Sequence, residues 1–238
     1  MKKDFLKYGN FIAFIAVVVF NILATMGVLG GVSTRDVSYM YRSLLTPADF
    51  AFSIWSIIYI LLMAMVFIQM KNEEMQEKLG IWFILSCILN IAWLFAWQYK
   101  LITISFILIF ALLLNLIMLM RNMNNYYSLS SLAIGLYAGW INVAMLANLG
   151  ALATRYNWML FGISARIWAI MGLIFGIVWI SCFIFAYSNV YYAIGACWGY
   201  LGIFSASVIS GIRIMAIIGM IFFIASAILV KIRKKMLT

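Results

Sequence analysis

Long apolar runs recur along the whole chain and restrict its fold more than any other feature. Each run has roughly 18 or more residues, enough for a helix to cross about 30 Å of hydrocarbon. Within a bilayer every backbone polar group must be hydrogen-bonded internally, so only helices and closed barrels can cross. The runs are continuous and do not alternate between polar and apolar residues, which favours helices. The sequence therefore predicts an all-α, polytopic integral membrane helix bundle.

About eight transmembrane helices are expected, separated by short polar or glycine-containing segments. Their predicted ranges are about 10–31, 47–70, 79–99, 101–121, 129–153, 166–187, 190–207 and 213–230. Only Lys100 separates the third from the fourth, which predicts a tight antiparallel hairpin. Four helices carry glycine pairs at a spacing that permits close helix packing, Gly27–Gly31, Gly135–Gly139, Gly172–Gly176 and Gly195–Gly199.

The single proline of the chain, Pro47, lies at the predicted start of the second helix. Thr46 can cap this helix, Pro47 suits its first position, and Asp49 lies where the acid of a capping box would reach back. The polar segment 32–46 precedes it. A solvated connector is the simplest interpretation of that segment, and a cover over the mouth of the bundle is the alternative.

Basic residues lie between and outside the apolar runs, and the net charge is +10. This distribution is typical of cytoplasmic loops in contact with anionic lipid headgroups. No basic face with spaced aromatic residues occurs outside the runs, so nucleic acid is not an expected partner. With eight helices and a cytoplasmic N-terminus, ten of the 16 lysines and arginines would be cytoplasmic. We therefore expect both termini in the cytoplasm.

The sequence offers little for side-chain catalysis. It contains no histidine, its three cysteines are scattered within apolar runs, and its six carboxylates lie in loops or at helix ends. Ser–His and Cys–His nucleophile pairs are therefore impossible, and no metal-binding cluster or phosphate-binding loop is present. We expect a protein that is not an enzyme, with no metal site and no required cofactor.

Aromatic and amide side chains do recur at helical spacing on the second, third and fifth predicted helices. The candidate ligand-binding residues are Phe52, Trp55, Tyr59, Asn90, Trp93, Trp97, Tyr137, Trp140, Ala144 and Asn148. Indole, phenol and amide groups are costly in lipid unless they are paired, so they favour the bundle interior. Together they would suit a flat, mostly apolar ligand. Ordinary core packing explains the same spacing.

These motifs resemble a known family. The segment TPADFAFSIWSIIY, residues 46–59, resembles the proline–aromatic signature of the TspO/MBR family of tryptophan-rich sensory or translocator proteins. Two further stretches are similar to motifs on the third and fifth helices of that family: Asn90-Ile-Ala-Trp93, and Tyr137-Ala-Gly-Trp140 followed by Asn148. The chain departs from the pattern at Ala48 and Leu136, where members often have proline.

The resemblance implies a five-helix TspO-like bundle over residues 1–155, with a porphyrin-binding pocket and a lid formed by residues 32–46. It assigns Trp55, Tyr59, Asn90, Trp93, Tyr137, Trp140 and Asn148 to that pocket. It also implies a porphyrin or haem-type ligand and a homodimer. Residues 156–238 would add three helices and a basic tail, like the C-terminal region of longer bacterial relatives, which implies a bacterial cell membrane.

The leading hypothesis is therefore a membrane binding or sensory protein for a hydrophobic planar ligand, a tetrapyrrole. A small transporter for a neutral metabolite is an alternative, and it would need a broken helix such as glycines near 30–31 or 199–202 could allow. A membrane partner or assembly protein is the third hypothesis. Uptake into liposomes would identify the transporter, and a co-purifying partner would identify the assembly protein.

Overall fold

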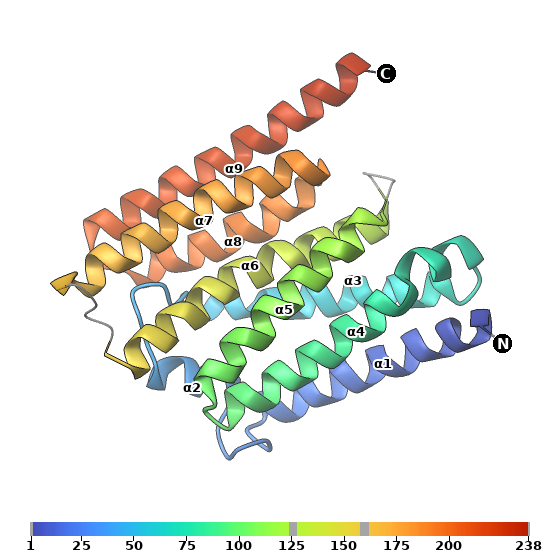
Figure 1. Ribbon diagram of the computed structural model, residues 1–238, viewed down its shortest axis with the longest axis horizontal. Coiled ribbons are helices and arrows are strands. Elements are labelled where there is room, and N and C mark those ends of the chain that lie inside the picture. Colours follow the sequence, from blue (N-terminus) through green and yellow to red (C-terminus); the bar gives the residue numbers. More distant parts are fainter. Residues whose placement is uncertain (1, 124–127, 158–161, 238) are drawn as a thin grey trace. The chain divides into compact units, whose positions relative to one another are not determined.

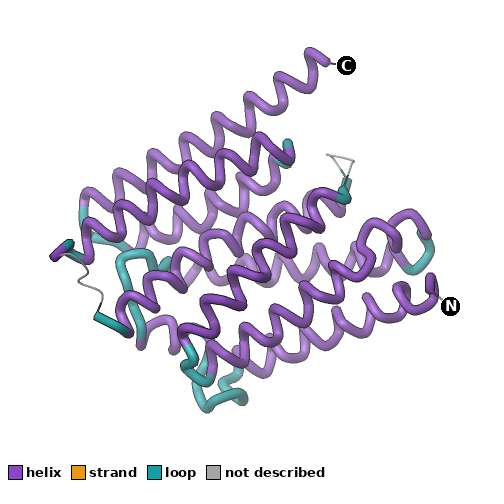
Figure 2. Tube along the Cα trace, viewed as in Figure 1, coloured by secondary structure: helices purple, strands orange, loops and turns teal. Residues whose placement is uncertain are grey.

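The computed structural model describes residues 2–123, 128–157 and 162–237, which form helices joined by loops and contain no strand (Figure 2). Within these described ranges, seven helices are long and apolar enough to cross a membrane. One further apolar helix, α8 (Val190–Ala206), is shorter, with 17 residues. The predicted all-α membrane bundle is confirmed.

Packing divides the chain into two compact units. Unit 1 comprises Met1–Met40 and Trp55–Ile134, and unit 2 comprises Tyr41–Ile54 and Gly135–Thr238. Each unit is therefore built from two separate stretches of sequence. The division predicted between residues 155 and 156 came from a family resemblance, and it stays a prediction.

Unit 1 is organised around α4 (Glu73–Gln98), which packs against both α1 (Lys2–Thr25) and α5 (Ile102–Arg121) (Figure 1). It also contains α2 (Thr34–Met40) and nearly all of α3 (Ile54–Gln69). Lys100 has a positive φ of 60° and reverses the chain between α4 and α5. The expected tight hairpin is confirmed.

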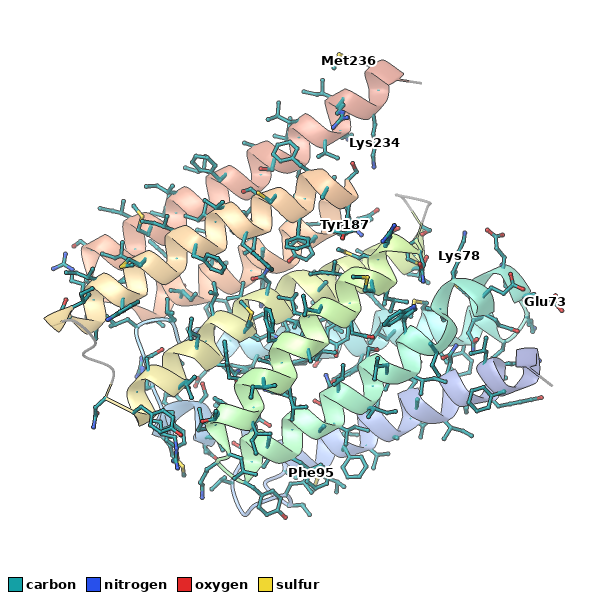
Figure 3. All side chains as sticks on the ribbon, in the orientation of Figure 1. Glu73, Lys78, Phe95, Tyr187, Lys234 and Met236 are labelled. Carbon is teal, nitrogen blue, oxygen red and sulfur yellow. The ribbon has the colours of Figure 1, made fainter. Side chains whose placement is uncertain are left out.

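Unit 2 contains the 3₁₀ turn η1 (Asp49–Ser53), most of α6 (Leu129–Arg155), α7 (Ala165–Tyr187), α8 and α9 (Ser210–Leu237). Helix α9 packs against both α7 and α8 (Figure 1). It continues beyond its predicted end near residue 230, so the basic tail is helical. Lys234, labelled in Figure 3 near the end of α9, donates from Nζ to the Ser188 carbonyl at 2.9 Å.

The end of the first helix was predicted wrongly. Helix α1 ends at Thr25, because Gly27 takes up a φ of +72° that side chains rarely adopt and its N–H bonds the Ala24 carbonyl. Gly31, at φ +75°, also lies beyond the helix. Gly27 and Gly31 are therefore not a helix-packing pair.

The start of the second predicted helix also differs. Regular helix begins at Ile54, not at Pro47, and the 3₁₀ turn η1 precedes it. Thr46 does not cap this turn, and its Oγ1 accepts a hydrogen bond from Ser43 N at 2.9 Å. The N–H of Ala48 donates to the Gly202 carbonyl of α8 at 3.0 Å. A long-range bond has thus replaced the local cap.

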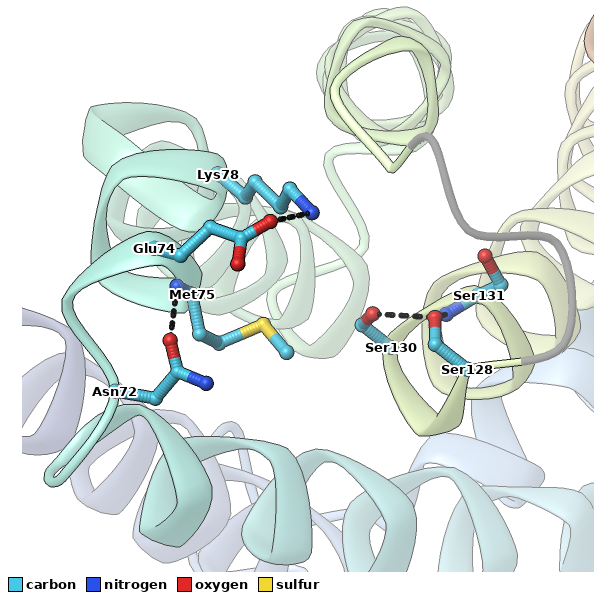
Figure 4. Close-up of polar contacts among 7 residues, drawn as sticks. All are labelled: Asn72, Glu74, Met75, Lys78, Ser128, Ser130 and Ser131. Atoms are coloured by element: carbon cyan, nitrogen blue, oxygen red, sulfur yellow. Dashed lines mark hydrogen bonds and ion pairs between the residues drawn. The ribbon is translucent and has the colours of Figure 1, made fainter.

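The starts of α4 and α6 follow ordinary capping rules (Figure 4). The Asn72 side chain accepts a bond from Met75 N at 3.0 Å, so α4 begins at Glu73, earlier than predicted. Gly80, at φ 49° and ψ −148°, interrupts α4 near this end. The Ser128 hydroxyl likewise accepts from Ser131 N at 3.2 Å at the start of α6.

The segment 32–46 contains a helix, α2, that the sequence analysis missed. Ser33 Oγ accepts from Asp36 N at 3.2 Å, and Asp36 Oδ2 accepts from Ser33 N at 3.0 Å. This reciprocal pair is a capping box whose Ser-x-x-Asp pattern is visible in the sequence. The Ser33 hydroxyl and N–H together hold the pKa of Asp36 below its ordinary value. The expected lid function of this segment stays a prediction.

Candidate ligand-binding site

Four aromatic rings from α3 and α4 form one continuous ladder within unit 1. Trp55 stacks on Tyr59 at 5.5 Å between ring centroids, with 16° between the ring planes. Trp55 also stacks on Trp93 at 6.3 Å and 27°, and Trp93 stacks on Trp97 at 6.2 Å and 24°. The order is therefore Tyr59, Trp55, Trp93, Trp97, and this row is called the aromatic ladder below.

The ladder follows from helical periodicity. Trp55 and Tyr59 are four residues apart on α3, and Trp93 and Trp97 are four apart on α4, so each pair shares a face. Tertiary packing adds the contact between Trp55 and Trp93. Each such ring pair contributes about 0.5–1.5 kcal/mol beyond the burial of its surface. The near-parallel planes form a stacked aromatic wall.

The end of the ladder is tied to α2. Trp97 Nε1 donates to the Thr34 carbonyl at 3.0 Å. The next residue, Gln98, donates from Nε2 to Thr34 Oγ1 at 2.9 Å and to the Ala24 carbonyl at 3.1 Å. Indole and amide N–H groups buried away from water need such acceptors. The segment after α1 is thereby attached to the last turn of α4.

A buried amide lies one helical turn before Trp93. Asn90 is fully buried, and its Oδ1 accepts a hydrogen bond from Asn21 Nδ2 of α1 at 3.0 Å. Asn21 Nδ2 also donates to the Val17 carbonyl at 2.8 Å. Asn21 belongs with the candidate site, although the sequence analysis did not include it. Its signal was a lone amide within an apolar run, and such residues face the bundle interior.

Removing the Asn21–Asn90 bond should cost about 1 kcal/mol of unfolding free energy, since interhelical hydrogen bonds in membrane proteins contribute about 0.6 and at most about 1.7 kcal/mol. A double-mutant cycle with Asn21→Ala and Asn90→Ala, measured by reversible unfolding in micelles, gives the coupling energy. Fully additive effects of the two substitutions would contradict a direct bond.

The third predicted face lies on α6, and all of its members are buried. Trp140 is 1% exposed and Tyr137 is 3% exposed. The ring of Phe52 meets Trp140 edge to face, at 6.0 Å and 78°. Asn148 Nδ2 donates to the Ala144 carbonyl at 3.0 Å. The predicted stripe on α6 is thus a buried face, joined at Trp140 by Phe52 from the segment before α3.

The opposite face of α6 packs against α8. A Cβ added to Gly139 would overlap the Tyr192 carbonyl oxygen, and one added to Gly195 would overlap that of Leu136. Beside this contact Asn142 Nδ2 donates to the Tyr192 hydroxyl at 2.7 Å, with both residues fully buried. One glycine of each predicted pair, Gly139 and Gly195, therefore lies at the backbone contact between the two helices. Asn142 is two residues from Trp140 and so faces away from the aromatic stripe.

The predicted site residues thus form two groups within the described structure. The ladder group contains Trp55, Tyr59, Asn90, Trp93 and Trp97. The α6 group contains Phe52, Tyr137, Trp140, Ala144 and Asn148. Neither group includes an ionisable acid or base other than tyrosine, so both suit an uncharged planar surface better than a charged one. That the two groups line one pocket stays a prediction.

Comparison with known protein families identifies a relationship that spans most of the chain. A family model described as TSPO-like protein matches residues 7–229. The match includes the ladder group, the α6 group, α7, α8 and most of α9, so it extends well beyond residue 155. No curated protein and no solved structure matches the chain.

Proposed function

This chain belongs to the TSPO-like protein family, and from that premise we propose that it binds a planar hydrophobic ligand of the tetrapyrrole class. Family membership makes it an integral membrane protein of the sensory or binding kind. The ligand, a porphyrin or haem-type macrocycle, is the proposal. It would be a reversible ligand and not a required cofactor.

The aromatic ladder is the observation that carries the proposal. A porphyrin is a flat, largely apolar ring system, and flat rings favour stacked or edge-to-face contacts with indole and phenol rings. The ladder supplies near-parallel rings, and the buried Asn90 amide, which accepts a bond from Asn21, lies one turn before Trp93 and braces this end of α4. A mostly aromatic surface with few polar groups is typical of small-molecule sites.

Titration of the purified full chain with protoporphyrin IX tests the proposal. We expect saturable quenching of tryptophan fluorescence, because a porphyrin stacked near several indoles accepts their excitation energy. Trp140→Ala and Asn90→Leu should each weaken the affinity by about tenfold, equivalent to about 1.4 kcal/mol. Ile224→Ala, at an exposed position of α9, is the control and should bind like the wild type. Quenching that never saturates would count against a specific site.

Binding without side-chain catalysis is part of the proposal. The chain contains no histidine, and a tetrapyrrole-processing reaction would need acid, base or metal groups at the ligand. We also propose that the chain forms a homodimer, as the resemblance implies. Sedimentation of the detergent-solubilised protein, with and without porphyrin, gives the oligomeric state.

We propose a bacterial cell membrane as the location, with both termini on the cytoplasmic side. If α8 crosses along with the seven longer spans, an even number of crossings returns the chain to its starting side. The basic residues Arg233 and Lys235 at the end of α9 favour the cytoplasm. A cysteine added after residue 238 of a cysteine-free variant should resist an impermeant thiol reagent in intact cells. Labelling before lysis would contradict this orientation.

A further inference from the structure

Helix α8 contacts the short segment that leads into α3 through two hydrogen bonds and one ring contact. The Ala48 N–H donates to the Gly202 carbonyl at 3.0 Å, and Trp198 Nε1 donates to the Ala51 carbonyl at 2.9 Å. The ring of Phe50 stands edge to face on Trp198, at 5.6 Å and 86°. All of these residues belong to unit 2, and Trp198 contacts the segment both through its indole N–H and through its ring.

The close approach of the segment depends on a glycine of α8. A Cβ built on Gly202 would lie 2.7 Å from the Ala51 Cβ and 2.9 Å from the Pro47 Cβ. Such distances leave no room for a side chain at residue 202. The turn η1 therefore rests directly on the α8 backbone, and its conformation is set by a surface about 150 residues later in the chain.

The segment that contacts α8 contains one residue of the candidate site. Phe52 directly follows Ala51, whose carbonyl Trp198 holds, and its ring packs against Trp140. Helix α8 also touches the other partner of this pair, since a Cβ on Gly195 would lie 2.9 Å from the backbone N of Trp140. Helix α8 thus contacts the residue before Phe52 and the backbone of Trp140.

We propose that Trp198 is a positioning residue for ligand binding, and that α8 is a working part of the binding site. This inference rests on the proposed function, because it assigns Phe52 and Trp140 to the ligand. A 3₁₀ turn of five residues is too short to be stable alone. The Ala51 carbonyl accepts one bond from the Ile54 N–H within the turn and a second from the Trp198 indole, and the indole bond fastens the turn to α8. Without the indole bond the turn loosens from α8 and Phe52 leaves its place against Trp140.

Two substitutions separate the contributions of Trp198 in the full chain. Trp198→Phe keeps an aromatic ring for Phe50 but removes the N–H donor, and Trp198→Leu removes both. The matched control is Trp179→Phe on α7, where Trp179 packs on Phe175 and Phe183 of the same helix. Amide hydrogen exchange of residues 48–54 is measured without ligand, and protoporphyrin IX affinity and the induced circular dichroism of the bound porphyrin are measured separately.

We expect Trp198→Phe to accelerate exchange in residues 48–54 and to weaken porphyrin binding about fivefold, as expected for one lost hydrogen bond. Trp198→Leu should have the larger effect in both measurements, and the control should change neither. The dichroism of the bound porphyrin should change for the Trp198 variants, because the bound ligand meets a displaced Phe52, and a loss of stability alone would not produce this change.

Unchanged exchange in residues 48–54 for both variants would overturn the inference, whatever the ligand does. Faster exchange with unchanged porphyrin affinity and dichroism would overturn the positioning role. If the wild type binds no porphyrin, the proposed function is wrong, and the role of Trp198 in ligand binding is wrong with it. The exchange data then still decide whether Trp198 holds the segment, so the two failures are distinguishable.

Discussion

Replacing Gly139 by alanine is expected to destabilise the fold by about 3 kcal/mol, at the upper end of overpacking effects. The added Cβ would overlap the Tyr192 carbonyl oxygen and lie 3.0 Å from the Ala196 backbone N. Both obstacles are backbone atoms of α8, so the two helices must separate to admit one methyl group. Alanine favours a helix over glycine by about 1 kcal/mol, which is too little to offset this.

The measurement is the free energy of unfolding of the purified chain in mixed micelles. Gly172→Ala on α7 is the matched control, because its Cβ would meet only the Leu45 Cδ1 methyl, at 3.3 Å. A side-chain end can move by a few tenths of an ångström, so this variant should be as stable as the wild type or slightly more so. Equal stability of Gly139→Ala and wild type would rule out the close α6–α8 contact.

Replacing Trp93 by leucine should weaken porphyrin binding by tenfold or more. Trp93 is one of the two central rings of the ladder and stacks on Trp55 of α3 and Trp97 of α4. Losing two stacked ring contacts removes about 1–3 kcal/mol of the interaction energy that holds the ladder in position. Each 1.4 kcal/mol corresponds to a factor of ten in the dissociation constant. The affinity is measured by quenching of the remaining tryptophans and, independently, by the absorbance shift of the porphyrin.

Trp82→Leu is the control for this substitution. Trp82 lies on the same helix but is 38% exposed. Its backbone carbonyl, and not its side chain, accepts the hydrogen bond from Asn115 Nδ2. Its replacement should change the affinity less than twofold. Trp93→Phe keeps a ring of smaller area and should give an intermediate value. Wild-type affinity in Trp93→Leu would exclude the ladder from the binding site.

The sequence could predict those contacts of the candidate site that lie within a single helix. Trp55 with Tyr59, and Trp93 with Trp97, follow from a four-residue spacing that places both side chains on one face. The amide partner of Asn90 could not be predicted, because Asn21 lies 69 residues away on α1 and no local spacing relates the two. Trp198 was missed for the same reason, since its partner Ala51 is 147 residues away.

At the predicted start of the second helix, long-range contacts overrode the local capping signals. Thr46, Pro47 and Asp49 form a good helix start, yet the chain makes a 3₁₀ turn there because Ala48 and Ala51 bond to α8. At Gly27 a local effect decided the structure. The sequence analysis assigned this glycine to helix packing, but it takes up a positive φ and ends the helix.

The sequence by itself determined that this is a bundle of membrane-spanning helices, because its apolar runs are continuous and do not alternate as the strands of a barrel do. It also determined which faces carry aromatic and amide groups, because helical periodicity is local. Only the tertiary structure decided which faces meet: the ladder between α3 and α4, the glycine contact between α6 and α8, and the grip of α8 on residues 48–51. In hydrocarbon, helices associate through close packing and hydrogen bonds between particular atoms, and such matches exist only once distant segments have come together.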